Sequence, residues 1–211
     1  MAEFRPISQT NVVYKLVSKV LANRLKVILP HIIIENQSAF MFERFIIDNV
    51  LVAFELMHYL DHKRDGKKNF MAVKLDMSKA YDRVEWSFIE KVMERMGFHE
   101  KWISMIMHCI TTVTYSILIN GVAHGSIIPT RGLRQGNSLS LYLFLLCADG
   151  FSSLINEATR NQMMSGISIC RGCPMVTHLF FADDSLLLCK ASTQECQKLN
   201  DILQLYEAAS S

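Results

Sequence analysis

Two apolar runs separated by adjacent carboxylates organise the chain. Residues 179–182 and 186–188 are apolar, and Asp183 and Asp184 lie between them. Each run has the length of a buried strand, so the pattern predicts a β-hairpin with an acidic tip. Adjacent like charges at the end of an apolar hairpin repel each other, and a divalent cation would relieve that repulsion. At this stage a metal site and a solvent-exposed acidic turn are both open.

The remaining pattern alternates between helical and strand segments. Apolar residues at helical spacing predict helices over residues 13–30, 48–60, 88–96, 99–110 and 139–158, and a last helix that begins at the capping box 192–195. Pro30 is expected to end the first helix. Strands are predicted over 70–75, 112–120, from the Asn120-Gly121 turn toward 128, 166–169 and 176–181. This mixture predicts an α+β fold with antiparallel strands.

A third acid follows the strand predicted over residues 70–75. Asp76 is far in sequence from Asp183 and Asp184, so only a tertiary fold brings the three together. The order of elements permits a ferredoxin-like split βαβ palm, in which adjacent central strands carry these acids. A carboxylate at a strand end that faces a carboxylate pair is the arrangement required for two-metal nucleotidyl transfer.

The composition indicates a globular protein but does not identify a binding partner. The 211 residues are 50% hydrophobic and 20% charged, as in a globular protein. The net charge of +2 does not indicate a nucleic-acid binder, so any electrostatic footprint is local. A run of about 18 uncharged apolar residues and a signal peptide are both absent. We therefore expect a soluble intracellular protein, nuclear or cytoplasmic, that is not secreted and binds no membrane.

The six cysteines are expected to be reduced thiols. Cys170 and Cys173 have metal-like spacing, but no second Cys or His pair follows at the distance typical of a zinc site. Reduced thiols also fit an intracellular protein.

Five blocks of sequence resemble, in order, the reverse transcriptases of plant-type LINE (non-LTR) retrotransposons. They are residues 5–8, 36–40, 74–86, 132–136 and 181–184. The resemblance implies an RNA-directed DNA polymerase that takes part in DNA integration and uses an RNA template with a DNA primer, dNTPs and two Mg²⁺ ions, with Mn²⁺ as an alternative. It implies a fingers–palm fragment of a right-hand polymerase, with about 1–70 fingers-like and about 70–211 mostly palm.

The same resemblance assigns roles to the acids and to one tyrosine. Asp76 and Asp183 are implied to be the principal catalytic metal ligands, and Asp184 the second member of the pair. Tyr81 resembles the steric gate that packs under the incoming sugar and disfavours a ribose 2′-hydroxyl. A tyrosine that simply packs in the core is the alternative for Tyr81.

Four further residues are implied to bind substrate. Arg5 resembles the fingers arginine that contacts the incoming triphosphate, since a guanidinium fork suits phosphate oxygens. Gln135 and Gly136 resemble the loop that packs against nucleotide and template. Arg44 is expected to contact template or nucleotide, with a surface arginine as the alternative.

The chain departs from the family pattern in two places. Asn137, Ser138 and Leu141 stand where the family usually has Asp, Pro and Pro, which is expected to loosen the loop before the long helix. Phe42 and Glu43 replace a Pro-Gly pair.

The chain also resembles a partial copy, with thumb and endonuclease domains not present. A non-catalytic nucleic-acid-binding remnant is therefore an alternative, because a thumb supplies much of the contact to primer and template. A generic metal-dependent phosphotransferase and a poorly folding fragment are further alternatives.

Overall fold

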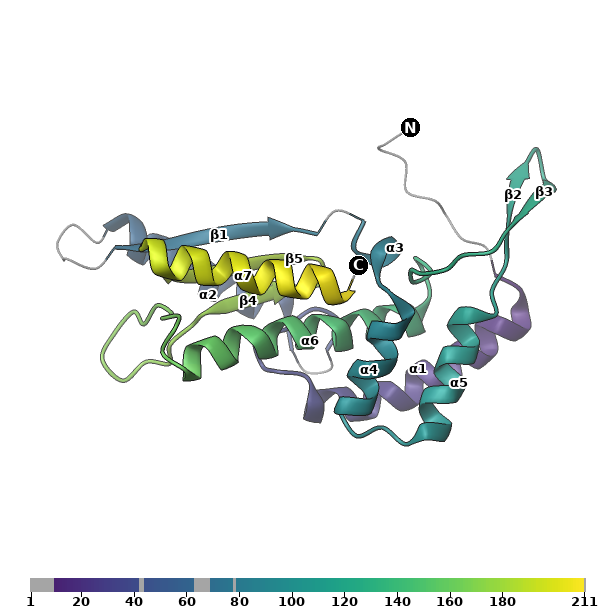
Figure 1. The fold of residues 1–211 in the computed structure, drawn as a ribbon, viewed down its shortest axis with the longest axis horizontal. Helices are drawn as coiled ribbons and strands as arrows, with labels where there is room; N and C mark the ends of the chain where they lie inside the picture. Colours follow the sequence, from purple (N-terminus) through teal and green to yellow (C-terminus); the bar gives the residue numbers. More distant parts are fainter. Residues whose placement is uncertain (1–9, 42–43, 63–68, 78, 211) are drawn as a thin grey trace. The chain divides into compact units, whose positions relative to one another are not determined.

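The computed structural model describes residues 10–41, 44–62, 69–77 and 79–210 (Figure 1). Its helices are α1 (Val12–Ile32), α2 (Ile46–His62), α3 (Ala80–Arg83), α4 (Trp86–Arg95), α5 (Glu100–Thr111), α6 (Ser138–Arg160) and α7 (Thr193–Ser210). Its strands are β1 (Phe70–Asp76), β2 (Tyr115–Ile119), β3 (Val122–Ile127), β4 (His178–Phe181) and β5 (Asp184–Lys190). The predicted α+β content with antiparallel strands is confirmed.

The chain divides into two compact units. The first unit consists of Met1–Ile28, Lys79–Cys147 and Ala209–Ser211, and the second of Leu29–Ser78 and Ala148–Ala208. The three acids Asp76, Asp183 and Asp184 all belong to the second unit. Tyr81, Gln135 and Gly136 belong to the first.

The second unit is built on a three-stranded antiparallel sheet of order β1-β5-β4. The register of β1 and β5 runs from Phe70 opposite Lys190 to Asp76 opposite Asp184. Strand β5 is central because both of its edges are paired. Its continuous apolar run is what a strand buried on both faces requires.

Alternate residues of β5 enter two separate cores. Leu187 and Cys189 pack with Phe151 of α6 and Ile202 of α7, and α7 lies along the sheet in Figure 1. Leu188 packs on the opposite face in a cluster that contains Leu56 of α2. The sheet is thus covered by helices on both faces.

The first unit contains the helix pair α4–α5 and the hairpin β2–β3. Gly97 separates the two helices with a left-handed φ of 80°. Asn120 and Gly121 form the hairpin turn with φ values of 50° and 84°, as expected for a turn that needs positive φ at both positions. Both connections were predicted from the sequence and are confirmed.

Helix α1 continues past Pro30, so the predicted end of this helix was wrong. The amide of Ile33 still donates to the Leu29 carbonyl at 2.9 Å. A proline removes one N–H donor, and in the last helical turn that loss affects a single hydrogen bond. The Arg44 guanidinium also donates to the carbonyls of Ile33 and Ile34, at 3.0 and 2.6 Å. The helix end is therefore satisfied by a side chain from outside the helix.

Two local predictions near the C-terminus were only partly right. Ser192 Oγ accepts from the Glu195 amide at 3.3 Å, which is one half of the predicted capping box. The Glu195 carboxylate instead accepts from the amides of Ser165 and Lys190, at 3.0 and 2.9 Å. In place of the strand predicted over 166–169, Ile167 alone makes an isolated bridge.

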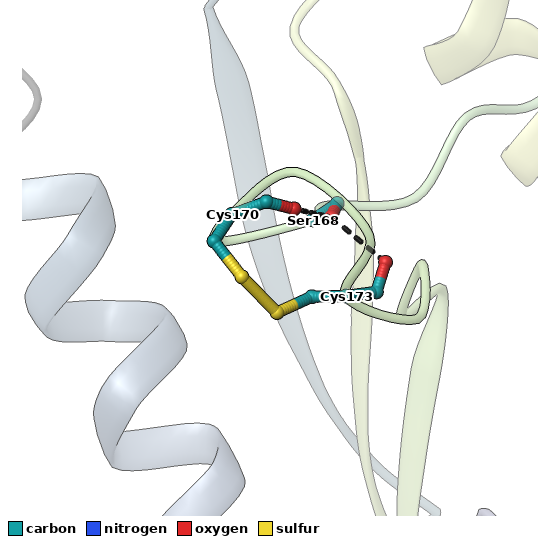
Figure 2. Close-up of a disulfide and its surroundings, with 3 residues drawn as sticks. All are labelled: Ser168, Cys170 and Cys173. Carbon is teal, nitrogen blue, oxygen red and sulfur yellow. Dashed lines mark hydrogen bonds between the residues drawn. A yellow bond between two sulfur atoms is a disulfide. The ribbon is translucent and has the colours of Figure 1, made fainter.

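Cys170 and Cys173 form a disulfide, so the expectation of reduced thiols was wrong for this pair (Figure 2). Gly172 adopts a φ of 85° and turns the chain, which brings the two Cα atoms to 5.4 Å. That separation lies within the range that a disulfide spans. Ser168 Oγ lies 2.9 Å from the Cys170 carbonyl oxygen and 3.0 Å from that of Cys173, so its single proton is shared between these two acceptors in the loop.

Helix α6 is long and apolar enough to cross a membrane by length and composition alone. However, 61% of its most apolar window is buried within the protein. Such burial is typical of the core helix of a globular protein, which passes the same test.

Candidate active site

The tip of the β4–β5 hairpin carries the two adjacent acids. Phe181 is paired with Asp184, so Ala182 and Asp183 form a two-residue turn. Ala182 has a φ of 62°, a left-handed conformation that residues other than glycine and asparagine seldom adopt. The hairpin predicted from the sequence is therefore confirmed, and its turn is tight.

Three polar residues, Asn36, Gln37 and Asn49, support this hairpin from the free edge of β4. Asn36 donates through its amide nitrogen to the His178 carbonyl at 2.7 Å, and its own carbonyl accepts from the Phe180 amide at 3.0 Å. Asn49 donates to the Phe180 carbonyl at 3.3 Å. The Gln37 carboxamide oxygen accepts from the Ala182 amide in the turn, at 3.5 Å. Polar side chains thus fix both the edge strand and the acidic tip.

Asp76 lies opposite Asp184 across the sheet. The two residues are the last paired positions of β1 and β5, and the Met77 amide donates to the Asp183 carbonyl at 3.4 Å. Side chains of directly opposed residues in neighbouring strands lie on the same face. The fold therefore brings Asp76 beside the hairpin tip, as predicted, although their roles in catalysis stay predictions.

Lys74 is a neighbour of the acids that the sequence interpretation missed. Its ammonium lies 3.3 Å from a carboxylate oxygen of Asp184. The lysine side chain is 72% exposed, so the pair is solvated and contributes little stability by itself. The signal was present in the sequence, because Lys74 precedes Asp76 by two positions and a strand places such residues on one face.

The three carboxylates of Asp76, Asp183 and Asp184 offer the hard oxygen donors that Mg²⁺ prefers, so their donor chemistry fits a magnesium ion. Across residues 10–41, 44–62, 69–77 and 79–210, however, no group of three or more His, Cys, Asp or Glu side chains is arranged to hold a metal ion. In this conformation one of the three carboxylates is paired with Lys74.

Tyr81 occupies α3 in the first unit. Its ring stacks on Phe144 with centroids 4.7 Å apart and an interplanar angle of 23°. Its carbonyl accepts from the Leu133 amide at 2.6 Å. The structure thus joins the Tyr81 segment to the glycine-rich loop before α6, two motifs that the sequence interpretation had treated separately.

Two glycines in that loop differ in the space that surrounds them. A Cβ on Gly132 would lie 2.8 Å from the Asp82 carbonyl oxygen, whereas a Cβ on Gly136 would meet no atom within 4 Å. Of these two glycines, Gly132 is therefore the one that another backbone segment approaches closely. Gln135 donates to the Asp82 carboxylate at 3.3 Å, which links it to the residue after Tyr81. Contacts of Gln135 and Gly136 with nucleotide or template stay predictions.

Arg44 lies among the described residues and binds backbone carbonyls. Arg44 donates to backbone carbonyls at the end of α1 and to the Gln37 carbonyl at 3.0 Å. Asp149, beside it, accepts from the Ile34 amide at 3.0 Å. Burial raises the pKa of the Asp149 carboxyl, an effect that the amide and the Arg44 charge oppose. Arg5 lies outside the described residues, as do Phe42 and Glu43, and the substrate roles of both arginines stay predictions.

The departures at the entry to α6 have a structural counterpart. Asn137 stands where the family usually has aspartate, and its side-chain oxygen accepts from the Leu139 amide at 2.9 Å. Asparagine is among the best residues at this capping position. The helix therefore begins at Ser138 with its first turn capped, without the prolines.

The chain matches the family model described as "Reverse transcriptase (RNA-dependent DNA polymerase)" over residues 1–210. It is 28% identical to the "Transposon TX1 uncharacterized 149 kDa protein" of Xenopus laevis, across 99% of this chain and 15% of that protein. It is 29% identical to a Pol polyprotein from the retrotransposable element R2 of Popillia japonica, across 89% of this chain and 25% of that protein. Over 68 residues it is 44% identical to an uncharacterized mitochondrial protein of Arabidopsis thaliana, covering 32% of this chain and 56% of that protein. These relatives include proteins of non-LTR retrotransposons, and the chain spans from about a seventh to about half of their lengths.

The fold is similar to that of a solved telomerase. A structure of telomerase from Candida tropicalis, in complex with a fragment of telomeric RNA, matches with a TM-score of 0.58 and 14% sequence identity. The match covers 90% of this chain and 31% of the telomerase chain. The predicted right-hand polymerase fold of α+β type is thereby confirmed.

Proposed function

Because the chain belongs to the reverse transcriptase (RNA-dependent DNA polymerase) family, we propose that it carries the active site of an RNA-directed DNA polymerase of a non-LTR retrotransposon. The reaction is addition of dNTPs to a primer 3′-hydroxyl on an RNA template. The observation that carries the proposal is the opposition of Asp76 and Asp184, with Asp183 in the adjoining turn.

The three acids are proposed to hold Mg²⁺, or Mn²⁺ in its place. Asp76 and Asp183 would be the principal ligands and Asp184 the accessory one. The chemistry supplied by bound Mg²⁺ is a lowered pKa of the primer 3′-hydroxyl and neutralised charge on the triphosphate. The chain's own contribution is placement, because a two-sided core and the side chains of Asn36, Gln37 and Asn49 hold the strand ends.

Residues of the first unit are proposed to select the nucleotide. Tyr81 would act as the steric gate against a ribose 2′-hydroxyl, with its ring held by Phe144. Gln135 and Gly136 would contact nucleotide and template, and Arg5 and Arg44 would contact triphosphate or template. The bonds from Leu133 and Gln135 to Tyr81 and Asp82 support a shared role for the two motifs.

The partners proposed are an RNA template, a DNA primer and dNTPs. Similarity to a protein of the plant Arabidopsis thaliana supports the plant-type part of the LINE assignment. A role in DNA integration is proposed on the resemblance alone. An intracellular location, in nucleus or cytoplasm, is also part of the proposal, and no membrane partner is proposed. Four cysteines of the described chain are free, as this location favours, whereas the Cys170–Cys173 disulfide is unusual for it. The division into a fingers-like part to about residue 70 and a mostly palm part beyond it also stays a proposal.

A second candidate function is nucleic-acid binding without catalysis. The observation in its favour is the Lys74–Asp184 ion pair, in which an ammonium is paired with the carboxylate proposed as the accessory Mg²⁺ ligand. Under this alternative the chain binds an RNA–DNA hybrid and extends no primer.

Primer extension with Mg²⁺ on a poly-rA template and an oligo-dT primer separates the two functions. We expect extension by the chain, and its loss in Asp183→Ala. Asp201→Ala is the matched control, because it removes an exposed carboxylate from α7 and leaves the hairpin tip unchanged. Hybrid binding without extension would support the non-catalytic function.

A further inference from the structure

Arg134 lies between two aromatic rings of the first unit. Its guanidinium carbon is 4.7 Å from the centroid of the Tyr14 ring and 5.0 Å from that of the Tyr115 ring. Both distances fall within the range of cation–π attraction. The two tyrosines come from α1 and β2, and Arg134 from the loop before α6, so the fold itself assembles this arrangement.

The two rings stabilise the charge of Arg134 through its faces. They are not acceptors for its N–H groups, which point outward in the plane of the guanidinium. The Nε atom is buried and has no hydrogen-bond partner among the described residues. A buried N–H without an acceptor costs free energy, and so does a partly buried charge without a counter-charge. A bound anion would supply a counter-charge to the guanidinium.

Arg134 also lines a polar pocket of about 330 Å³. Its other polar walls include Thr10, Asn11, Thr112 and Thr114, and no described wall residue is acidic. The side-chain oxygen of Asn11 accepts a hydrogen bond from the Tyr14 amide at 2.7 Å, so the side-chain NH₂ group of Asn11 is left as a donor. The Thr112 hydroxyl donates to the His108 carbonyl at 2.6 Å, so the donors beside the Arg134 cation are the Asn11 amide and the hydroxyls of Thr10 and Thr114. Such a lining suits an anion.

We propose that this Arg134 pocket binds a phosphate of a nucleic-acid strand. An arginine that is stacked on aromatic rings and flanked by hydroxyl donors is typical of surfaces that follow a single strand. The inference rests on the proposed function, since it takes the strand to be the template or primer of the polymerase. It adds a phosphate site made of residues of the first unit.

The test measures binding directly, by fluorescence anisotropy of a labelled RNA–DNA hybrid with a single-stranded template overhang, over a series of salt concentrations. In Arg134→Gln we expect about tenfold weaker binding, as for the loss of one charge-assisted contact. The slope of log Kobs against log salt should become shallower by about 0.7 to 0.9, the value for one phosphate.

Arg131→Gln is the matched control. Arg131 lies in the same loop and loses the same charge, but its guanidinium is paired with Glu85 at 3.3 Å. We expect its salt slope to stay at the wild-type value. A second variant, Thr114→Glu, places a carboxylate at the pocket while Arg134 is kept, and it should also weaken binding and reduce the slope. Circular dichroism checks that each variant is folded.

Equal losses of strand affinity in Arg131→Gln and Arg134→Gln would overturn the proposal, because they would show that binding depends on the total positive charge and not on this pocket. Unchanged binding in folded Thr114→Glu would also overturn it. So would a raised KM for dNTP in Arg134→Gln with unchanged strand binding, which would assign the phosphate to the nucleotide. Because strand binding is measured without catalysis, failure of primer extension is a separate result that leaves the pocket test intact.

Discussion

Lys74 and Asp184 form an ion pair at the edge of the candidate active site, with the ammonium 3.3 Å from the carboxylate. The two residues come from neighbouring strands, and the lysine side chain is largely exposed. The pair therefore adds little to stability. Its effect is instead on the charge at the hairpin tip, where it offsets the carboxylate of Asp184.

Lys74→Met is expected to increase the affinity of this tip for a divalent cation. An exposed pair is worth up to about 1 kcal/mol, so the expected gain is about two- to fivefold. Electron paramagnetic resonance of Mn²⁺ titrated into the chain measures this affinity without substrate.

The control is Lys91→Met, which removes an exposed lysine from α4 and should leave Mn²⁺ affinity unchanged. Asp76→Asn should weaken binding, since it removes a proposed ligand. Equal affinities for wild type and Lys74→Met would show that the ion pair does not compete with the metal.

Tyr81→Ala is expected to reduce discrimination against ribonucleotides. Removal of the ring opens the space that the proposed gate denies to a 2′-hydroxyl, and the ratio of kcat/KM for dTTP over UTP should fall by about ten- to a hundredfold. Single-nucleotide extension with each substrate measures the ratio.

Tyr81→Phe serves as the control for this change. It keeps the ring that stacks on Phe144 and should retain the wild-type ratio. If the kcat/KM ratio of dTTP over UTP were similar in Tyr81→Ala and wild type, Tyr81 would be only a packed aromatic residue and not a steric gate.

The hairpin and the position of Asp76 were predictable from the sequence because each depends on a local pattern. The apolar runs around Asp183 and Asp184 leave few conformations other than two paired strands. The run before Asp76 reads as a strand for the same reason. An interior strand with apolar residues on both faces must be central, and β5 is.

The remaining contacts depend on side chains that meet only in the folded chain. The Arg44 guanidinium satisfies carbonyls of α1, which no sequence pattern announces. The Glu195 carboxylate binds the amides of Ser165 and Lys190 instead of completing a capping box, because those donors are brought beside it by the fold. The disulfide of Cys170 and Cys173 depends on the turn at Gly172.

Gly132→Ala is expected to destabilise the first unit. Its Cβ would lie 2.8 Å from the Asp82 carbonyl oxygen, and the residue has a φ of 90°. Backbone strain of this kind costs about 1 to 3 kcal/mol, and the steric overlap adds to it. Chemical denaturation measures the loss.

Gly97→Ala provides the comparison. Gly97 has a φ of 80°, but a methyl group added there would meet no atom within 4 Å, so its cost should be that of the conformation alone, about 1 kcal/mol. Equal losses in the two variants would show that the contact between the Gly132 loop and Asp82 does not constrain the fold.

His178 is expected to make the stability of the chain sensitive to acid. The residue is fully buried, its ring nitrogens lie 2.5 Å from Ser152 Oγ and 2.8 Å from Thr177 Oγ1, and burial lowers its pKa to about 4. In the unfolded chain the imidazole has its ordinary pKa of 6.5 and binds a proton at a higher pH. As the pH falls, the unfolded state therefore binds a proton at His178 before the folded state does. The free energy of unfolding decreases as the pH falls from about 6.5 toward 4.

The expected loss of unfolding free energy from this residue is about 2 kcal/mol between about pH 7 and pH 5. Urea denaturation at the two pH values measures it, with His178→Gln as the comparison. The glutamine variant has no imidazole to protonate, so its stability should decline less over the same interval, even though it is less stable at neutral pH. A decline as large as that of the wild-type chain would assign the acid sensitivity to other groups and show that the buried imidazole is not its source.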